Sequence, residues 1–129
     1  MILPTPEEWT AWLDRLRATE LILVEGVKDV RSLADLGITA TPLRGPLHEV
    51  IDRASAKNCV LLTDLDTEGK RLHGMLKEQL TRNGVIVDDN AREFLFRTPV
   101  RHIEGLATYL RGRVDKTIAK NESSFACPD

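Results

Sequence analysis

Short apolar runs along the chain alternate with segments whose apolar residues recur every three or four positions. The runs span 21–24, 38–43, 59–63 and 85–87. The segments with helical spacing lie around 30–36, 46–56 and 67–82. Buried strands that alternate with helices are typical of βαβ units, which form a parallel sheet with helices on both faces. The pattern therefore predicts an α/β fold, a compact three-layer Rossmann-like arrangement with a mainly parallel four-stranded sheet.

A further helix is predicted ahead of the first strand. Thr5 can cap it, Pro6 suits its first position, and apolar residues then recur from Trp9 to Leu16. Trp9 and Trp12 could stack on bases, but on this apolar face we expect them in the core or in a subunit interface. The face leaves two arrangements open, the core of a monomer and the interface of a homodimer.

Length and composition indicate one domain spanning 1–129. A chain of 129 residues with 42% hydrophobic and 29% charged residues has the size of a single core. We expect a motif-bearing part at about 20–89, a helical extension at about 90–120 that breaks at Pro99, and a tail at 121–129. The apolar runs are far shorter than the roughly 20 residues of a membrane span, so we expect a cytoplasmic protein with no membrane partner.

Net charge and the numbers of cysteines and histidines bear on two kinds of function, nucleic-acid binding and metal binding by cysteine or histidine. A formal net charge of −2 carries no bulk signature of nucleic-acid binding. Cys59 and Cys127 are too few for a structural zinc site, and Cys59 suits a buried apolar position. His48, His73 and His102 have no metal-ligand spacing, so we expect surface or packing roles for them.

Carboxylates follow two of the predicted strands directly. Glu25 ends the first strand, with Asp29 four residues later, and Asp64 and Asp66 follow the third. Ligands of parallel sheets gather beyond the carboxyl ends of the strands, so these acids meet if the two strands are neighbours. Clustered carboxylates repel one another, which is costly unless a cation is bound or the pKa of one of them is raised. Oxygen-only ligands favour Mg²⁺, with Mn²⁺ as the alternative. The competing interpretation is a solvated loop or a helix cap.

Glycines and basic residues stand beside these acids. Gly26 and Gly69 leave room for backbone N–H groups to face a phosphate, and the bases supply positive charge. The predicted set that binds phosphate or nucleic acid is Gly26, Lys28, Arg31, Gly69, Lys70 and Arg71.

Other phosphate or metal motifs fit less well. A calcium loop from Asp64 would need Glu where Met75 stands, and no Walker phosphate loop occurs. The Asp-x-Asp pattern of a haloacid-dehalogenase-type phosphatase would need Thr where Glu68 stands, although Asp88-Asp89 keeps that alternative open. A small-molecule phosphatase is therefore a further hypothesis.

Two stretches resemble motifs of the toprim domain. Residues 24–30, VEGVKDV, are similar to its first motif as it occurs in bacterial-type DnaG primases, and residues 62–69, LTDLDTEG, are similar to its Asp-x-Asp-x-x-Gly motif. The resemblance covers about Glu20 to Asp89. It implies a compact α/β domain that binds Mg²⁺ and acts on phosphodiester bonds of DNA or RNA.

Carried onto this chain, the resemblance makes Glu25 the general acid or base and places Glu25, Asp64 and Asp66 around the metal. Asp29 matches a further acid of the primase-like motif, which implies a supporting electrostatic role. Primases carry a third acidic pair, and Asp88-Asp89 matches it only loosely.

Within the toprim family, some classes need more than this chain offers. A full primase adds a zinc ribbon and a polymerase subdomain, and a topoisomerase needs a nucleophilic tyrosine in a separate domain, whereas the single tyrosine here is Tyr109. The class that remains is the small standalone toprim protein, similar to ribonuclease M5. We expect an endonuclease first; the alternatives are a RecR-like module that binds nucleic acid or recruits a protein partner, and a small primase-like protein.

The last third of the chain differs in charge. Between 91 and 120, seven bases stand against three acids. The bases are Arg92, Arg97, Arg101, Arg111, Arg113, Lys116 and Lys120. Such clustering could track a nucleic-acid backbone, and a solvated helix face is the alternative.

Overall fold

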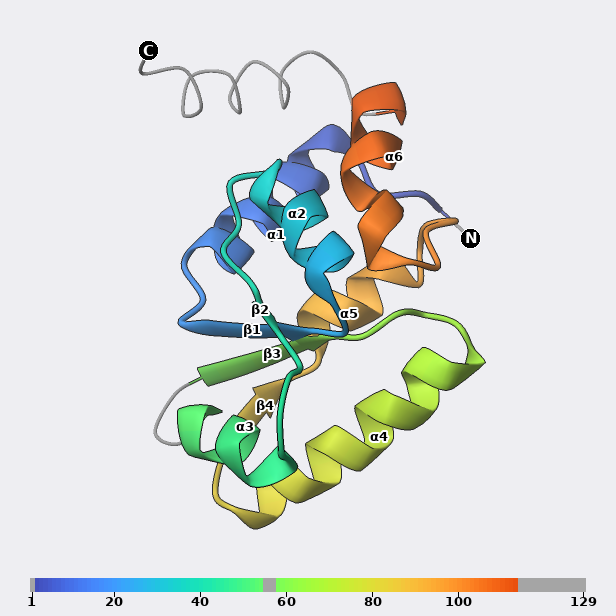
Figure 1. Cartoon of the computed structure of the whole chain (residues 1–129). Coiled ribbons are helices and arrows are strands. Elements are labelled where there is room, and N and C mark those ends of the chain that lie inside the picture. Colours follow the sequence, from blue (N-terminus) through green and yellow to red (C-terminus); the bar gives the residue numbers. More distant parts are fainter. Residues whose placement is uncertain (1, 55–57, 114–129) are drawn as a thin grey trace.

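A four-stranded sheet lies at the centre of the molecule (Figure 1). The computed structural model describes residues 2–54 and 58–113. The strands are β1 (Leu21–Val24), β2 (Thr41–Pro42), β3 (Asn58–Leu62) and β4 (Ile86–Asp88). They are arranged in the order β2-β1-β3-β4, and every pair is parallel. The predicted α/β class is confirmed, and the sheet formed by the described residues is parallel throughout.

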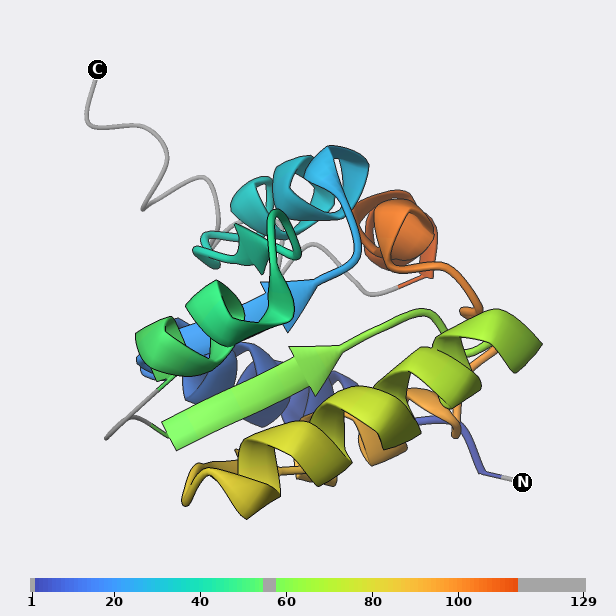
Figure 2. The same ribbon diagram turned by 60° about the horizontal axis from the view of Figure 1, so that its bottom comes forward.

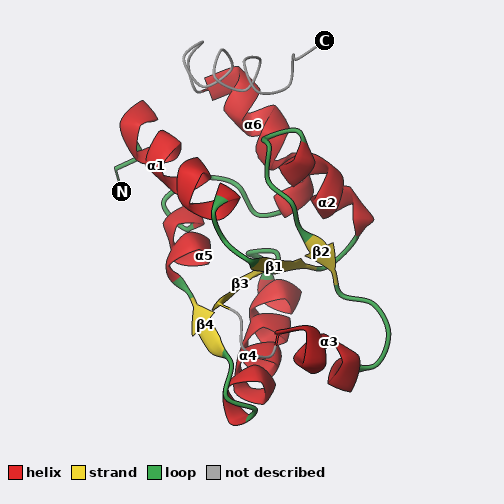
Figure 3. Ribbon diagram, turned by 90° about the vertical axis from the view of Figure 1, so that its left-hand side faces the viewer, coloured by secondary structure: helices red, strands yellow, loops and turns green. Residues whose placement is uncertain are grey.

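Helices cover both faces of this sheet, which makes three layers (Figure 3). One face carries α1 (Pro6–Arg17), α2 (Val27–Ala34), α5 (Asn90–Leu95) and α6 (Leu106–Arg113). The other face carries α3 (Leu47–Ala54) and α4 (Thr67–Arg82). A single 3₁₀ turn, η1 (Ile103–Gly105), leads into α6. This arrangement is Rossmann-like.

Alternate residues of β1 and β3 pack into two separate cores, one on each face. The larger core takes Ile22, Val24, Val60 and Leu62. The smaller core, against α3 and α4, takes Leu21, Leu23, Cys59 and Leu61. Both strands are buried on both faces, as their continuous apolar runs predict. Cys59 is fully buried, which confirms the buried apolar position predicted for it, and this burial raises the pKa of its thiol to about 11.

The tryptophans of α1 belong to the larger core. The helix begins as predicted, because the Thr5 hydroxyl accepts a hydrogen bond from the Glu8 N–H. Trp9 and Trp12 are only 2% and 5% exposed, and the Trp12 indole N–H donates to the Ala91 carbonyl at 2.8 Å. The expected core role is confirmed, and this face is available neither for stacking on bases nor as the surface of a homodimer.

The structure differs from the predictions in the length of the second strand and in the orientation of one residue of α4. The second strand is shorter than 38–43, because the Ile38 N–H donates to the Leu33 carbonyl and so closes the end of α2 instead of joining the sheet. The apolar spacing of 67–82 also predicts that Met75 faces inward, but this residue of α4 is 45% exposed.

Some predictions fall on residues outside the described ranges. These are the end of the helix expected at 46–56, the extension from 114 to 120, the tail at 121–129 and Cys127. Among the helices that the structure describes, none is long and apolar enough to cross a membrane.

Candidate functional site

Glu25 and Asp64 lie just beyond the carboxyl ends of two paired strands. β1 and β3 pair with Val24 opposite Leu62, so both segments leave the sheet at the same edge (Figure 2). The Glu25 carboxylate accepts a hydrogen bond from the Asp64 backbone N–H at 2.8 Å. The prediction that these two strands are neighbours is confirmed, and so is the meeting of Glu25 with Asp64.

Asp29 is the most buried acid of this edge, with 6% of its surface exposed. Its carboxylate accepts a hydrogen bond from the Gly26 N–H at 3.1 Å, which holds the turn that enters α2. Burial raises the pKa of the Asp29 carboxyl, and the nearby carboxylates of Asp64 and Glu25 raise it further. Asp29 therefore supports the turn after β1 and places a carboxyl that resists ionisation beside the other acids.

The loop after β3 is fastened by a segment about forty residues further along the chain. The Ile103 N–H donates to Asp64 Oδ1 at 2.8 Å. The Leu65 N–H donates to the Arg101 carbonyl, also at 2.8 Å. Two hydrogen bonds thus join residues 101–103 to residues 64–65, one through Arg101 and one through Ile103, and they hold Asp64 in one orientation.

Arg92 supports the same loop from inside the protein. Its side chain is 5% exposed and donates from Nε to the Thr63 carbonyl at 3.2 Å and from Nη2 to the Asp64 carbonyl at 2.8 Å. Desolvation lowers the pKa of the Arg92 guanidinium, and the acids of this edge act in the opposite direction. Arg92 therefore fits neither alternative left open for the bases of the last third, a nucleic-acid-binding surface or a solvated helix face, because its guanidinium donates to carbonyls inside the protein.

Asp66 caps the N-terminus of α4. Its Oδ1 accepts a hydrogen bond from the Gly69 N–H at 2.8 Å, so the helix-cap interpretation holds for this oxygen. A Cβ on Gly69 would lie 1.9 Å from the Asp64 carbonyl oxygen, so the close approach of α4 to the loop requires glycine. The N–H groups of Gly26 and Gly69 both donate to carboxylates; phosphate binding by either glycine stays a prediction.

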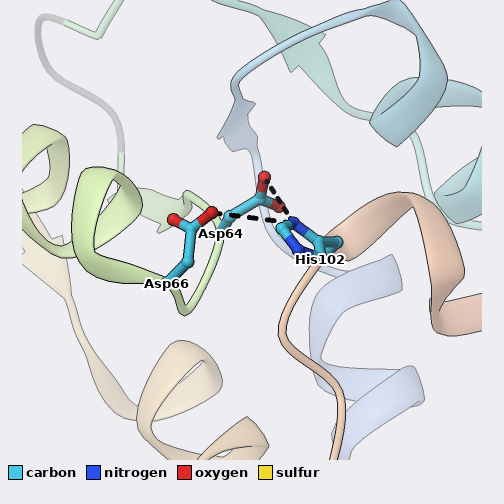
Figure 4. A group of neighbouring side chains, drawn as sticks. All are labelled: Asp64, Asp66 and His102. Atoms are coloured by element: carbon cyan, nitrogen blue, oxygen red, sulfur yellow. Dashed lines mark hydrogen bonds and ion pairs between the residues drawn. The ribbon is translucent and has the colours of Figure 1, made fainter.

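His102 joins the two aspartates, which sequence reasoning missed. Its Nδ1 lies 3.3 Å from Asp64 Oδ2 and 3.7 Å from Asp66 Oδ2 (Figure 4). The hydrogen bond with Asp64 raises the pKa of the His102 imidazole. Within the described residues, these three are the one group of three or more histidine, cysteine or acidic side chains whose ligand atoms lie within 4.8 Å of one another. No local spacing could have indicated His102, because it lies 36 residues after Asp66.

The toprim resemblance places Glu25 around the metal with Asp64 and Asp66, but in the structure it is His102, not Glu25, whose ligand atom lies beside the carboxylates of both aspartates. The Glu25 carboxylate accepts a hydrogen bond from the backbone of Asp64, and it is outside the group of converging ligand atoms around His102. The metal-binding role of Glu25 stays a prediction.

The four bases predicted beside the acids lie on two helices, α2 and α4. Lys28 and Arg31 are exposed on α2 and line an open groove of about 370 Å³ together with Glu104. On α4, the Lys70 ammonium lies 5.5 Å from the centre of the Phe96 ring. Arg71 forms an exposed ion pair at 3.0 Å with Glu68, also of α4. The α2 pair therefore presents its charge to the groove.

Other bases of the last third form hydrogen bonds and ion pairs within the protein. Arg97 forms two hydrogen bonds with Glu8, at 2.9 and 3.0 Å, and these lower the pKa of the Glu8 carboxyl to about 2. Arg101 donates to nearby backbone carbonyls, and Arg111 pairs with Asp35 at 3.4 Å. Lys116 and Lys120 lie outside the described residues, and of Arg113 only the backbone, at the end of α6, is described. The described part of this segment thus contributes packing contacts and ion pairs.

Asp88 and Asp89, the acidic pair that matches the primase motif only loosely, also form ion pairs within the protein. Asp88 pairs with Arg15 at 3.0 Å. Asp89 pairs with Lys77 and lies 3.0 Å from the ring nitrogen of His73. These basic partners neutralise the pair, and neither acid belongs to the converging group around Asp64.

The fold and this edge define a small α/β protein with a parallel, Rossmann-like sheet and acids beyond the ends of its two central strands. The chain belongs to the UPF0292 family. It is 32% identical over 102 residues to a UPF0292 protein of Methanocaldococcus jannaschii, covering 72% of this chain and 80% of the relative. It is 37% identical over 120 residues to a UPF0292 protein of Pyrococcus horikoshii, covering 86% and 91%.

A solved structure supports the fold. A protein from Aquifex aeolicus matches with a TM-score of 0.67 and 35% identity, over 74% of this chain and 94% of that one. No family model matches the chain.

Proposed function

We propose that this chain performs divalent-metal-dependent chemistry on the phosphodiester bonds of nucleic acid, in the first place as an endonuclease. The observation that carries the proposal is the hydrogen bond that joins Glu25 to Asp64 at the edge of the sheet where Asp66 also lies. The resemblance of residues 24–30 and 62–69 to toprim motifs gives further support, since it assigns the chemistry to these same acids.

The donor set at this edge fits a divalent cation. Asp64 and Asp66 each have one carboxylate oxygen bound by a backbone N–H, which orients the group. The other oxygens of both groups face the same point, next to the His102 ring. Carboxylate oxygens held in this way are suitable ligands for Mg²⁺ or Mn²⁺. Bound there, such a cation supplies a Lewis acid that polarises a phosphate and balances its charge.

Glu25 is the residue to which we assign proton transfer. It is half-buried, and its carboxylate is tied to the backbone of Asp64, so its distance from the metal-binding aspartates is fixed. A carboxylate in this position can take a proton from an attacking hydroxyl group or return one to a leaving group. Asp29 keeps the turn after Glu25 in place through its bond to Gly26.

We assign binding of the substrate strand to the exposed bases of α2. Lys28 and Arg31 line the groove that runs from α2 toward η1 and α6. Charged side chains in such a groove bind flanking phosphates without reading sequence, and their contribution weakens as salt rises. Lys70 and Arg71 are the corresponding candidates on α4.

Cleavage assays test the proposal. The protein is incubated with labelled structured RNA, single-stranded DNA and duplex DNA, in Mg²⁺, Mn²⁺ or EDTA. We expect metal-dependent cleavage that falls by about 100-fold or more in Glu25→Gln and in Asp64→Asn. Asp52→Asn, which changes an exposed aspartate of α3, is the matched control and should cleave normally.

Three other results would contradict the proposal. Undiminished cleavage in both variants would show that other residues do the chemistry. Binding without cleavage would favour the RecR-like module that holds nucleic acid or recruits a partner. Turnover of a phosphate monoester with indifference to polynucleotides would favour a small-molecule phosphatase.

A further inference from the structure

We propose that His102 is a third metal ligand of this site, which makes the site a mixed nitrogen and oxygen centre that prefers a first-row transition metal to Mg²⁺. The inference rests on the proposed function, because it adds a ligand to the metal site of that proposal.

The position of His102 is set by the residues on either side of it. The Arg101 carbonyl accepts the Leu65 N–H, and the Ile103 N–H donates to Asp64 Oδ1. His102 lies between these two backbone hydrogen bonds, so its ring is brought to the aspartates by the fold and not by its own flexibility. Ligands that are held in place before the metal arrives bind it with less loss of conformational freedom.

The ring nitrogen meets the two carboxylate oxygens that backbone groups leave available. Nδ1 is 3.3 Å from Asp64 Oδ2 and 3.7 Å from Asp66 Oδ2, and all three ligand atoms fall within 4.8 Å of one another (Figure 4). The His102 side chain is 56% exposed, so the remaining side of the centre is open to water or a substrate phosphate. A cation at this point would be held by three side chains that two separate segments contribute.

Ligand chemistry determines the metal preference. Mg²⁺ takes oxygen ligands and keeps much of its water, so an imidazole adds little to its binding. First-row transition metals accept imidazole nitrogen readily, and a site with one histidine and two carboxylates suits them. His102 should therefore increase the affinity for such metals more than it increases the affinity for Mg²⁺.

Metal binding in the absence of substrate tests the inference. Binding of Mn²⁺ and of Mg²⁺ to the full chain is measured by titration calorimetry, and bound Mn²⁺ is examined by pulsed electron paramagnetic resonance for coupling to a histidine nitrogen. The variants are His102→Asn, Asp64→Asn and, as the matched control, His48→Asn, which changes an exposed histidine of α3. Circular dichroism checks that each variant is folded.

We expect tighter binding of Mn²⁺ than of Mg²⁺ in the unmodified chain, with nitrogen coupling. His102→Asn should remove the coupling and weaken Mn²⁺ binding by about tenfold or more, with a smaller change for Mg²⁺. His48→Asn should match the unmodified chain. Nitrogen coupling that persists in His102→Asn, or equal losses for both metals, would overturn the inference.

The design separates failure of this inference from failure of the proposed function. Metal binding that depends on Asp64 but not on His102 would overturn the inference alone. Binding that depends on both residues, in a protein that cleaves no nucleic acid, would support the inference and overturn the nuclease proposal. Absence of metal binding in the unmodified chain would overturn both.

Discussion

The loops that follow β1 and β3 begin alike and are held in different ways. Each connects a buried parallel strand to a helix, and each has an acid within its first two residues. The β1 loop is closed locally, since Asp29 bonds to Gly26 only three residues away. The β3 loop is held from a distance, since Ile103 bonds to Asp64 across 39 positions and Arg92 to the same residue across 28. The same local pattern can thus be supported by neighbouring residues or by remote ones.

This difference has a consequence for the candidate site. The β1 turn is closed by its own residues, and Glu25 bonds it to the β3 loop. The β3 loop carries Asp64 and Asp66, and its geometry depends on α5 and η1 being folded onto it. Changes in the last third of the chain should therefore reach Asp64 and Asp66, although none of the bases there needs to touch a substrate.

The largest effect is expected from removing the remote support of the β3 loop. Arg92→Met should lower the free energy of unfolding by about 2–4 kcal/mol, because the buried carbonyls of Thr63 and Asp64 lose their donors. Urea unfolding measures the change. Arg82→Met, at an exposed ion pair of α4, is the control and should cost less than about 0.5 kcal/mol. Equal losses in the two variants would refute the special role of Arg92.

A pair of glycines in α4 sharpens the comparison, because the same substitution should have opposite effects. Gly69→Ala should destabilise the protein by about 1–3 kcal/mol and weaken metal binding, since its methyl group would lie 1.9 Å from the Asp64 carbonyl oxygen. Gly74→Ala, with nothing within 4 Å, should stabilise it by about 0.5–1 kcal/mol through helix propensity. Thermal unfolding of both variants tests the signs. A stabilising Gly69→Ala would show that the loop is free to move.

The smallest effect concerns the locally closed β1 loop, and it depends on pH. The pKa of Asp29 is raised in the folded protein, above its ordinary value of 3.8, so the folded state binds the proton more tightly than the unfolded state. The contribution of this carboxyl to the free energy of unfolding is most favourable at a pH below 3.8, and it is lost as pH rises through the folded-state pKa. Asn can keep the bond to Gly26 without a charge.

Relative to the unmodified chain, Asp29→Asn should therefore gain stability as pH increases. Urea unfolding of both proteins between about pH 3 and pH 7 gives the difference curve. A difference that is constant with pH, or that falls, would contradict the burial of an ionisable group at this position.

Much of the fold could be predicted because its signals are local. The apolar runs of β1 and β3 and the spacing of α1 and α4 are properties of short windows, and the structure confirms them. The meeting of Glu25 and Asp64 followed from a general rule about parallel sheets once the strands were taken as neighbours. Boundaries were less accurate where a helix end and a strand compete for the same backbone group, as at Ile38.

The remaining features of the candidate site depend on contacts between segments far apart in the sequence. The residue types showed that bases gather in the last third of the chain. They could not show that Arg92 faces inward, because that depends on which carbonyls lack donors in the folded chain. Nor could spacing link His102 to Asp64 and Asp66, since that contact forms only when η1 is fastened to the β3 loop. Local patterns were enough for the elements and for the acids at the strand ends. The grouping of those acids with a histidine and a buried arginine was decided by tertiary structure, because hydrogen bonds between remote segments are a property of the folded chain alone.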